Sequence, residues 1–276
     1  MTDTTGIAYE ILALRYGIFD GRVRANNFMM AEDHLAPSPL DFYVFAIRGP
    51  IGDPDPRVIV MDTGFNPVSA ARRGRSMIAT PDETLRQAGI EPNEVKQVVL
   101  THLHWDHAGG MAYFPNAVFH LQDSEMGFAT GRCMCQPFLR RPFDVDDVQS
   151  AVGALYAQRI QFHDGASEGP AEIAPGITLH LVGGHSGGMQ SMRVPTRRGP
   201  VVLAGDAVHL WENIQTRNPF PIVVDMARML AGFDLLEGLC DGPDHLIPGH
   251  DPLILKRFPM AGDNPNIVRL DLPPIA

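Results

Sequence analysis

Short apolar runs separated by turn-forming residues dominate the hydrophobic pattern of the chain. Residues 42–48 (FYVFAIR) and 57–61 (RVIVM) are runs of this kind, and the Gly, Asp and Pro residues between them are typical of a hairpin loop. Further runs predict strands at 9–16, 95–100, 117–121, 158–163, 177–182, 189–194, 201–204 and 245–247. We therefore expect many strands, several of which pair with their neighbours in sequence.

Helical signals alternate with these strands. Thr80 is placed as an N-cap, with Pro81 at the first helical position and Glu83 three residues after the cap, and Gly89 ends that helix. Three more helices are predicted at 123–130, 144–157 and 221–238. Hairpins of strands with helices outside them favour an α+β fold, a four-layer αββα sandwich in which two mixed sheets lie face to face.

The length of 276 residues is compatible with one large domain, so we expect a single domain over residues 1–276. Its least regular part is a polar loop or arm at about 17–41, and a loop of this length in a compact domain is often functional. Residues 28–30 (FMM) at its tip are expected either to wall an apolar pocket or to pack on the domain or on a partner subunit. The second alternative is compatible with a homodimer.

The charge balance narrows the range of partners. Lys and Arg number 22 against 32 Asp and Glu, and a net charge of −10 disfavours binding to nucleic acid or to an anionic membrane. No apolar run approaches the ~18 residues that cross a bilayer, and residues 1–6 show no signal peptide, so a cytoplasmic location is expected. Cys133 and Cys135 are expected to be reduced thiols rather than a soft metal site.

Candidate chemistry is concentrated in residues 101–110, THLHWDHAGG. His102, His104, Asp106 and His107 are four potential metal ligands within six positions, and they follow an apolar strand. His and Asp suit zinc and neighbouring first-row metals. The H-x-H-x-D-H spacing can turn one pair of side chains toward one metal and the next pair toward a second.

Three further candidate ligands, His185, Asp206 and His250, also stand at strand ends. Each follows an apolar strand and a glycine. Ligands on rigid strand ends are well positioned, and glycine lets the backbone come close. Five other histidines are expected to be core or surface residues: His34, His120, His163, His180 and His245.

The motifs H-x-H-x-D-H, G-H, G-D and a final G-H occur in this order along the chain. They resemble the metal motifs of the metallo-β-lactamase superfamily, over about residues 62–250. Asp62 begins a D-T-G turn similar to the one that supports the metal site in that family. The resemblance implies two divalent metal ions, zinc first, with manganese, iron or cobalt also fitting. It assigns His102, His104 and His185 to one metal, Asp106, His107 and His250 to the other, and Asp206 to both.

Within the superfamily, the chain resembles the N-acyl homoserine lactonases, which are quorum-quenching enzymes. Asp206 stands where exported zinc β-lactamases carry Cys, and the short segment after His250 leaves no room for the helical domain of glyoxalase II enzymes. The resemblance implies hydrolysis of a small-molecule lactone or ester by attack of a hydroxide that bridges the metals. Asp106 would act as general acid for the leaving oxygen.

One position departs from the lactonase pattern. Several lactonases carry Tyr three residues after the bridging Asp, where it touches the lactone carbonyl, and this chain has His209 there. Because a histidine can also donate a hydrogen bond, His209 is a candidate catalytic residue; the alternative is a surface or supporting histidine. Lactone or ester hydrolysis remains the expectation, whereas the departure leaves the acyl-homoserine-lactone substrate open.

Other activities of the same fold remain open. The chain could hydrolyse another ester, a thioester or an amide, or it could be a redox or sulfur-transfer enzyme with one iron. The set of Asp106, His107 and His250 favours two metals over one. A metal-stabilised binding protein is the non-enzymatic alternative, and it would bind a ligand without hydrolysing it.

Overall fold

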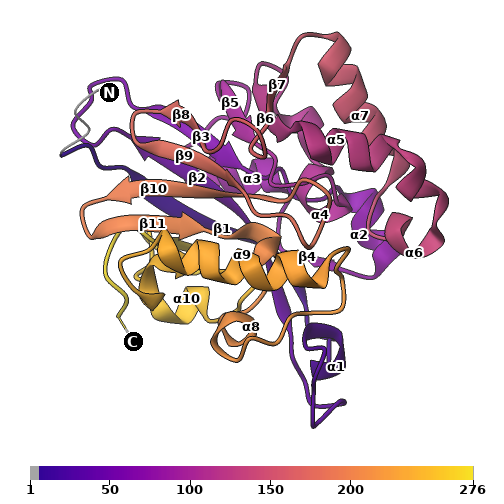
Figure 1. Cartoon of the computed structure of the whole chain (residues 1–276). Coiled ribbons are helices and arrows are strands. Elements are labelled where there is room, and N and C mark those ends of the chain that lie inside the picture. The colour runs from indigo at the N-terminus through magenta and orange to yellow at the C-terminus, as the bar shows by residue number, and fades with distance from the viewer. Residues whose placement is uncertain (1–5, 276) are drawn as a thin grey trace.

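Two sheets packed face to face between helices form the structure, a computed structural model that describes residues 6–275 (Figure 1). Residues 1–5, which carry most of the expectation about a signal peptide, lie outside this range. Within residues 6–275, no helix combines the length and the apolar character needed to span a membrane.

The first sheet has the strand order β13-β1-β2-β3-β5-β6-β7, with β4 paired to β1. Its strands are β1 (Glu10–Phe19), β2 (Leu40–Gly49), β3 (Arg57–Met61), β4 (Ser76–Met77), β5 (Gln97–Val99), β6 (Val118–Gln122), β7 (Ile160–His163) and β13 (Ile267–Arg269). Strands β13, β1, β2 and β3 are antiparallel, whereas β3, β5, β6 and β7 are parallel.

The second sheet has the order β12-β11-β10-β9-β8. Its strands are β8 (Ala171–Ala174), β9 (Ile177–Leu181), β10 (Gln190–Thr196), β11 (Gly199–Leu203) and β12 (Leu246–Ile247). They pair antiparallel except for β11 and β12, which are parallel. Both sheets are therefore mixed, as expected.

The helices are short, apart from α7 (Val145–Tyr156) and α9 (Met226–Gly238) on the outer faces (Figure 1). They are α1 (Arg24–Asn27), α2 (Pro67–Arg73), α3 (Pro81–Gln87), α4 (Trp105–Ala108), α5 (Asp123–Thr130), α6 (Pro137–Arg140), α7 (Val145–Tyr156), α8 (Trp211–Gln215), α9 (Met226–Gly238) and α10 (Ile254–Arg257). Short 3-10 turns lie at Met111–Tyr113, Arg132–Cys135, Gly205–Ala207 and Pro243–His245. The predicted capping box of Thr80 and Glu83 is present at α3.

Side-chain alternation along the strands explains the layers. In β1, Ile11 and Ala13 join the apolar core between the sheets, whereas Leu12 and Leu14 join the core beneath the helices of the first sheet. Successive strand residues point to opposite faces, so one strand contributes to both cores. On the far side, Phe233 of α9 packs in a third cluster with residues of the second sheet. The αββα prediction is confirmed.

Two predicted segments have different limits in the structure. The arm is shorter than 17–41, because β1 continues to Phe19 and pairs with Leu40 at the start of β2. The last long helix begins at Met226 instead of 221, since the side chain of Asp225 caps it by accepting a hydrogen bond from the backbone of Arg228. Three short strands, β4, β8 and β13, were not predicted from the hydrophobic pattern.

Candidate metal centre

Loops at strand ends of both sheets bring the seven predicted ligands together. His102 and His104 follow β5 of the first sheet, and α4 carries Asp106 and His107. The other three come from the second sheet: His185 follows β9, Asp206 follows β11 and His250 follows β12. Their ligand atoms fall into groups in which all atoms lie within 4.8 Å of one another.

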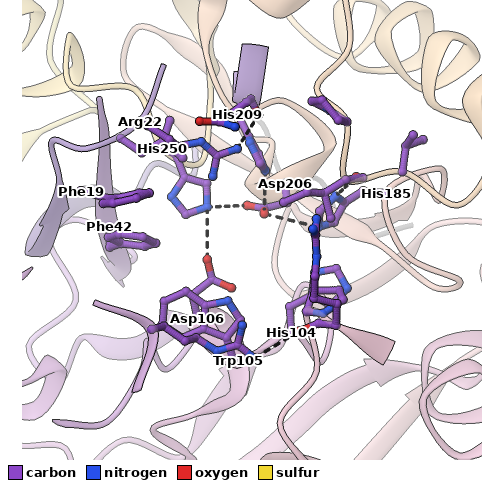
Figure 2. A pocket seen from close by; sticks show the side chains of 18 of the residues that line it. Phe19, Arg22, Phe42, His104, Trp105, Asp106, His185, Asp206, His209 and His250 are labelled. Carbon is purple, nitrogen blue, oxygen red and sulfur yellow. Dashed lines mark hydrogen bonds and ion pairs between the residues drawn. The ribbon is translucent and has the colours of Figure 1, made fainter. Parts of the chain in front are cut away.

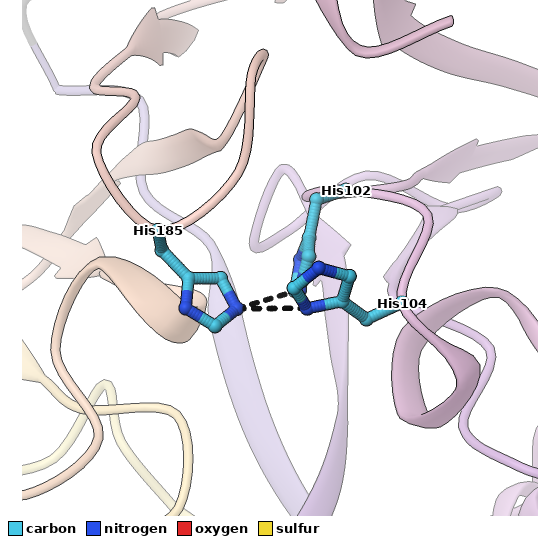
Figure 3. A group of neighbouring side chains, drawn as sticks. All are labelled: His102, His104 and His185. Atoms are coloured by element: carbon cyan, nitrogen blue, oxygen red, sulfur yellow. Dashed lines mark hydrogen bonds between the residues drawn. The ribbon is translucent and has the colours of Figure 1, made fainter. Parts of the chain in front are cut away.

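The first group consists of His102, His104 and His185 (Figure 3). Nε2 of His185 lies 3.1 Å from Nε2 of His102 and 2.9 Å from Nδ1 of His104. Three buried imidazoles therefore direct ring nitrogens at one another with no carboxylate between them. Such an arrangement is favourable around a cation that the nitrogen lone pairs can share.

The second group consists of Asp106, His107, Asp206 and His250. Oδ1 of Asp206 lies 3.1 Å from Nε2 of His107 and 2.9 Å from Nε2 of His250. Oδ2 of the same carboxylate lies 3.4 Å from Nε2 of His185 in the first group. Asp206 is thus placed between the two groups, as Figure 2 shows.

Outer hydrogen bonds orient the histidine rings. Nδ1 of His107 lies 2.8 Å from Oδ2 of Asp62, the residue that begins the D-T-G turn. Nδ1 of His185 lies 2.7 Å from the carbonyl oxygen of Ile222, and Nδ1 of His250 lies 2.9 Å from that of Asp41. Because one nitrogen of each ring is bonded away from the centre, the other nitrogen points inward, as in many metal-binding histidines.

Burial and charge set the protonation of the site. Burial lowers the pKa of His102 and of His104 well below its ordinary value, and neighbouring imidazoles add to the effect, so both rings are neutral. Burial alone would raise the pKa of Asp206, but His107 and His250 outweigh it and hold that pKa well below the usual range. Burial alone would lower the pKa of His107, but Asp206 and Asp62 outweigh it and raise that pKa well above its ordinary value. The ionised carboxylate and the neutral rings of His102 and His104 are in the forms that bind metals, whereas His107 would release a proton on metal binding.

Several inward-facing atoms fit a metal better than a hydrogen-bonded network. In the described chain, Nε2 of His104, Nε2 of His107 and Oδ1 of Asp206 are buried and make no hydrogen bond. Oδ1 of Asp206 is close to Nε2 of His107 and of His250, but these contacts are ion pairs without hydrogen-bond geometry. Buried polar atoms are almost always partnered, and those that are not call for an explanation such as an ion. Nitrogen and oxygen ligands in this number suit zinc and its neighbours, so these residues fit the divalent metals that the family resemblance implies.

His209 is buried beside the centre and is not a surface residue. Its Nε2 lies 2.9 Å from Oδ2 of Asp206, and its ring stacks on Phe220 with 3.3 Å between centroids. It also forms a potential ligand group with His185 and Asp206. The structure thus places His209 at the centre, in contact with the carboxylate that links the two groups.

Glu125 of α5 was not singled out from the sequence, although it supports the site. Its buried carboxylate accepts hydrogen bonds from the backbone of Leu103 at 2.9 Å and of Gly188 at 2.7 Å, and from the hydroxyl of Ser186 at 2.7 Å. It therefore fastens the loop of His102 and His104 to the loop of His185. A buried acid in a helix gives no local signal in the sequence that it will do this.

A cavity of about 790 Å³ opens onto the centre (Figure 2). Asp106, Asp206, His209 and His250 are among its lining residues. Met29 of the arm lines it, so the predicted apolar tip at residues 28–30 contributes one side chain, and Phe138 of α6 contributes another. Cys133 and Cys135 are free thiols outside its lining, and the five histidines predicted to be non-ligands belong to none of the groups described above.

The chain belongs to the metallo-beta-lactamase superfamily, whose family model matches residues 51–250. Among its relatives, N-acyl homoserine lactonase AiiB of Agrobacterium fabrum is 31% identical over 170 residues, which are 56% of this chain and 60% of the relative. N-acyl homoserine lactonase AiiA of Bacillus thuringiensis subsp. kurstaki is 30% identical over 151 residues, 54% of this chain and 49% of the relative. The chain therefore spans about half to three fifths of these relatives.

Solved structures have the same fold. A quorum-quenching N-acyl homoserine lactone lactonase superposes with a TM-score of 0.70 at 21% identity, over 89% of this chain and 93% of that one. The hydrolase AbOPH of the beta-lactamase superfamily superposes with a TM-score of 0.67 at 19% identity, over 88% of this chain and 87% of that one. The αββα architecture is therefore shared along most of the chain.

Proposed function

We propose that the protein is a metal-dependent lactonase that holds two divalent metal ions and hydrolyses an N-acyl homoserine lactone or a related lactone or ester. The observation that carries this proposal is the convergence of the seven predicted ligands, one of which, Asp206, contacts histidines of both groups. The similarity to N-acyl homoserine lactonases supports the lactone as substrate. Zinc is the proposed metal.

In the proposed reaction, some residues would hold the metals and His209 would position one of the ligands. Two bound divalent cations would polarise the substrate carbonyl and lower the pKa of the attacking water toward neutrality. His102, His104 and His185 would hold one cation, Asp106, His107 and His250 the other, and Asp206 would contact both. His209 would keep Asp206 oriented through the 2.9 Å contact of its Nε2.

Asp106 is suited to move the proton. It lines the cavity, and its carboxylate lies 3.9 Å from Nε2 of both His107 and His250. The carboxylate of Asp206 lies closer to the same two nitrogens. During ring opening the water oxygen bonds to the carbonyl carbon and the ring C–O bond breaks. The proton released by the water passes through Asp106 to the departing alkoxide, which yields a hydroxy acid.

A substrate panel with metal analysis tests the proposal. Lactones with short and long acyl chains, aryl esters and β-lactams are offered to the metal-loaded protein. We expect two metal ions per chain, preferential turnover of lactones, loss of activity on chelation and its return when zinc or manganese is added. No turnover of any lactone or ester, or one iron per chain, would overturn the proposal.

A substitution at Asp106 separates catalysis from metal binding. Asp106→Asn is expected to lower kcat about 100-fold or more, because an amide cannot relay the proton. Metal content is measured on the same sample, so that loss of a ligand and loss of a proton carrier can be distinguished. His34→Ala, which removes an exposed histidine of the arm, is the matched control and should keep wild-type turnover. Wild-type kcat in the Asp106→Asn enzyme would exclude this proton path.

A further inference from the structure

Four arginines line the cavity of a protein whose net charge is −10: Arg22, Arg73, Arg75 and Arg141. Arg22 lies at the start of the arm, Arg73 ends α2, Arg75 precedes β4 and Arg141 follows α6. Three separate segments, at residues 22, 73–75 and 141, thus supply positive charge to one cavity. N-acyl homoserine lactones carry no charge that would require it.

One of the four arginines forms an ion pair, and among the described residues the other three do not. Arg73 pairs with Asp144 at 2.6 Å, a carboxylate that it shares with Arg72 outside the cavity lining. Within residues 6–275, no carboxylate oxygen lies within 4.0 Å of a guanidinium nitrogen of Arg22, Arg75 or Arg141. Uncompensated like charges that share a cavity repel one another, and a bound anion relieves that repulsion.

Arg75 is held at the cavity wall by aromatic rings. Its guanidinium lies 3.6 Å from the centroid of Phe19 and 5.8 Å from that of Trp105, two rings that also line the cavity. Its Nε is buried and has no hydrogen-bond partner in the described chain. Nη1 donates to the backbone oxygen of Arg73, and within the described residues Nη2 makes no hydrogen bond. Cation–π contact fixes the guanidinium without using up its N–H donors, so those of Nη2 are left for a ligand.

Arg22 is fixed near the metal centre. Its Nε donates to Oδ1 of Asn27 at 2.6 Å, and its Nη2 donates to the backbone oxygen of Asn26. Figure 2 places its side chain beside His209 and His250, on the side of the cavity where Phe19 lies. Burial lowers the pKa of Arg22 to about 10; Arg75 and Arg141 add to this shift, whereas Asp106 and Asp206 oppose it, and the guanidinium is still charged at neutral pH.

We propose that the substrate carries an anionic group, a carboxylate or a phosphate, which Arg22 and Arg75 bind while the ester or lactone carbonyl lies over the metal centre. Guanidinium groups match both oxyanions, since each offers paired N–H donors to paired oxygens. Arg141 adds positive charge at the exposed rim of the same cavity. This inference rests on the proposed hydrolase function and names its substrate class.

The first test compares two lactones that differ only in charge. A γ-lactone with a side-chain carboxylate and the same lactone with a carboxamide are given to the metal-loaded protein. We expect kcat/KM to favour the acid at least about tenfold, and this preference to fall about tenfold in Arg22→Gln and in Arg75→Gln, mainly through KM. Arg197→Gln, at an exposed hairpin turn outside the cavity, makes the same charge change and should keep the preference.

Several measurements keep the test decisive if one variant is unstable. The KM of the wild-type enzyme for the acid should rise with ionic strength, whereas that for the amide should not. Arg22→Lys restores the charge and should recover part of the preference. Equal kcat/KM for acid and amide, with no response to either arginine substitution, would overturn the inference and leave lactone hydrolysis standing.

Equilibrium binding provides a readout that needs no catalysis. Isothermal titration of the metal-loaded protein with glutarate, propyl phosphate and glutaramide should show binding of an anion that Arg75→Gln weakens about tenfold, and no binding of the diamide. The relative affinities of glutarate and propyl phosphate distinguish a carboxylate from a phosphate substrate. Anion binding without turnover of any lactone or ester would reject the proposed function but keep the anion site, and binding insensitive to Arg75→Gln would reject the site.

Discussion

Asp206 is the residue on which the two halves of the centre depend. Its carboxylate lies within 3.4 Å of ring nitrogens from His107, His185, His209 and His250. Burial alone would raise the pKa of this carboxylate, but His107, His250 and His209 outweigh it and hold that pKa well below the usual range. Replacement of any of the four rings therefore removes a contact of the group that links both proposed metals.

Asp147 is a buried acid outside the centre and has a destabilising charge. Burial, helped by Asp144 and Asp146, raises its pKa from 3.8 to about 7, and its Oδ2 has no hydrogen-bond partner in the described chain. The native state therefore binds the proton more tightly than the unfolded chain. The stabilisation that comes from this tighter proton binding is complete below pH 3.8, declines as the pH rises toward about 7, and is absent above about pH 7.

Asp147→Asn should accordingly stabilise the protein at pH 8 relative to wild type by roughly 1 kcal/mol, allowing for solvent screening, and much less at pH 5. Thermal unfolding at the two pH values measures the difference. Asp123→Asn is the matched control, since it removes the same charge from an exposed position in the first turn of α5, and Asp123 does not contribute to the shift at Asp147. A variant whose advantage does not grow between pH 5 and pH 8 would contradict the assignment.

At the scale of elements, helix α5 supports the loops that carry His102, His104 and His185. Besides the three hydrogen bonds of Glu125, the loop after β9 lies directly on this helix: a Cβ at Gly188 would stand 2.3 Å from the backbone nitrogen of Glu125. Only glycine permits this approach. The positions of His102, His104 and His185 therefore depend on a helix that contributes no ligand.

Glu125→Gln should weaken metal binding about 10- to 100-fold, the usual effect of removing a group that orients ligands. The amide cannot accept all of the hydrogen bonds that the carboxylate accepts. Metal affinity is measured by competition with a chelator, next to thermal unfolding of the metal-free protein, which separates loss of positioning from loss of folding. Asp123→Asn, exposed in the same helical turn, should bind metal normally. Wild-type affinity in Glu125→Gln would show that Glu125 of α5 does not position the ligand loops.

At the scale of the whole molecule, the centre joins the two sheets. The ligands of each proposed metal come from both: His102 and His104 from the first with His185 from the second, and Asp106 and His107 from the first with His250 from the second. A ligand that binds only the folded state stabilises it, so metal at about 1,000 times its Kd contributes about 4 kcal/mol.

Removal of the metals should therefore lower Tm by on the order of 10 °C for a chain of this size. Differential scanning calorimetry before and after chelation measures the change, with metal content checked by elemental analysis. Zinc should restore Tm, whereas magnesium should not, because it prefers oxygen ligands in an octahedral arrangement. An unchanged Tm after verified depletion would argue against a metal that joins the sheets.

The local pattern of the sequence was sufficient to predict most strands and to single out seven candidate ligands that the fold brings together. Apolar runs specified the long strands, the capping box specified α3, and the seven candidate ligands all follow buried strands whose ends meet in space. The segments that the sequence pattern predicted incorrectly or missed are those that depend on tertiary contacts. β13 forms because residues 267–269 pair with β1, and β1 reaches Phe19 because it pairs with Leu40.

Only the tertiary structure decided what surrounds the metal centre. Glu125 supports it from a helix, and His209 is buried against Phe220 instead of lying on the surface. Arg22 and Arg75 reach one cavity from segments that are far apart in the sequence. A strand-end ligand is recognisable from its neighbours in the chain, because backbone geometry places it. A cavity wall is assembled from distant segments by packing, so its charge, and with it the proposed preference for an anionic substrate, appears only in the folded molecule.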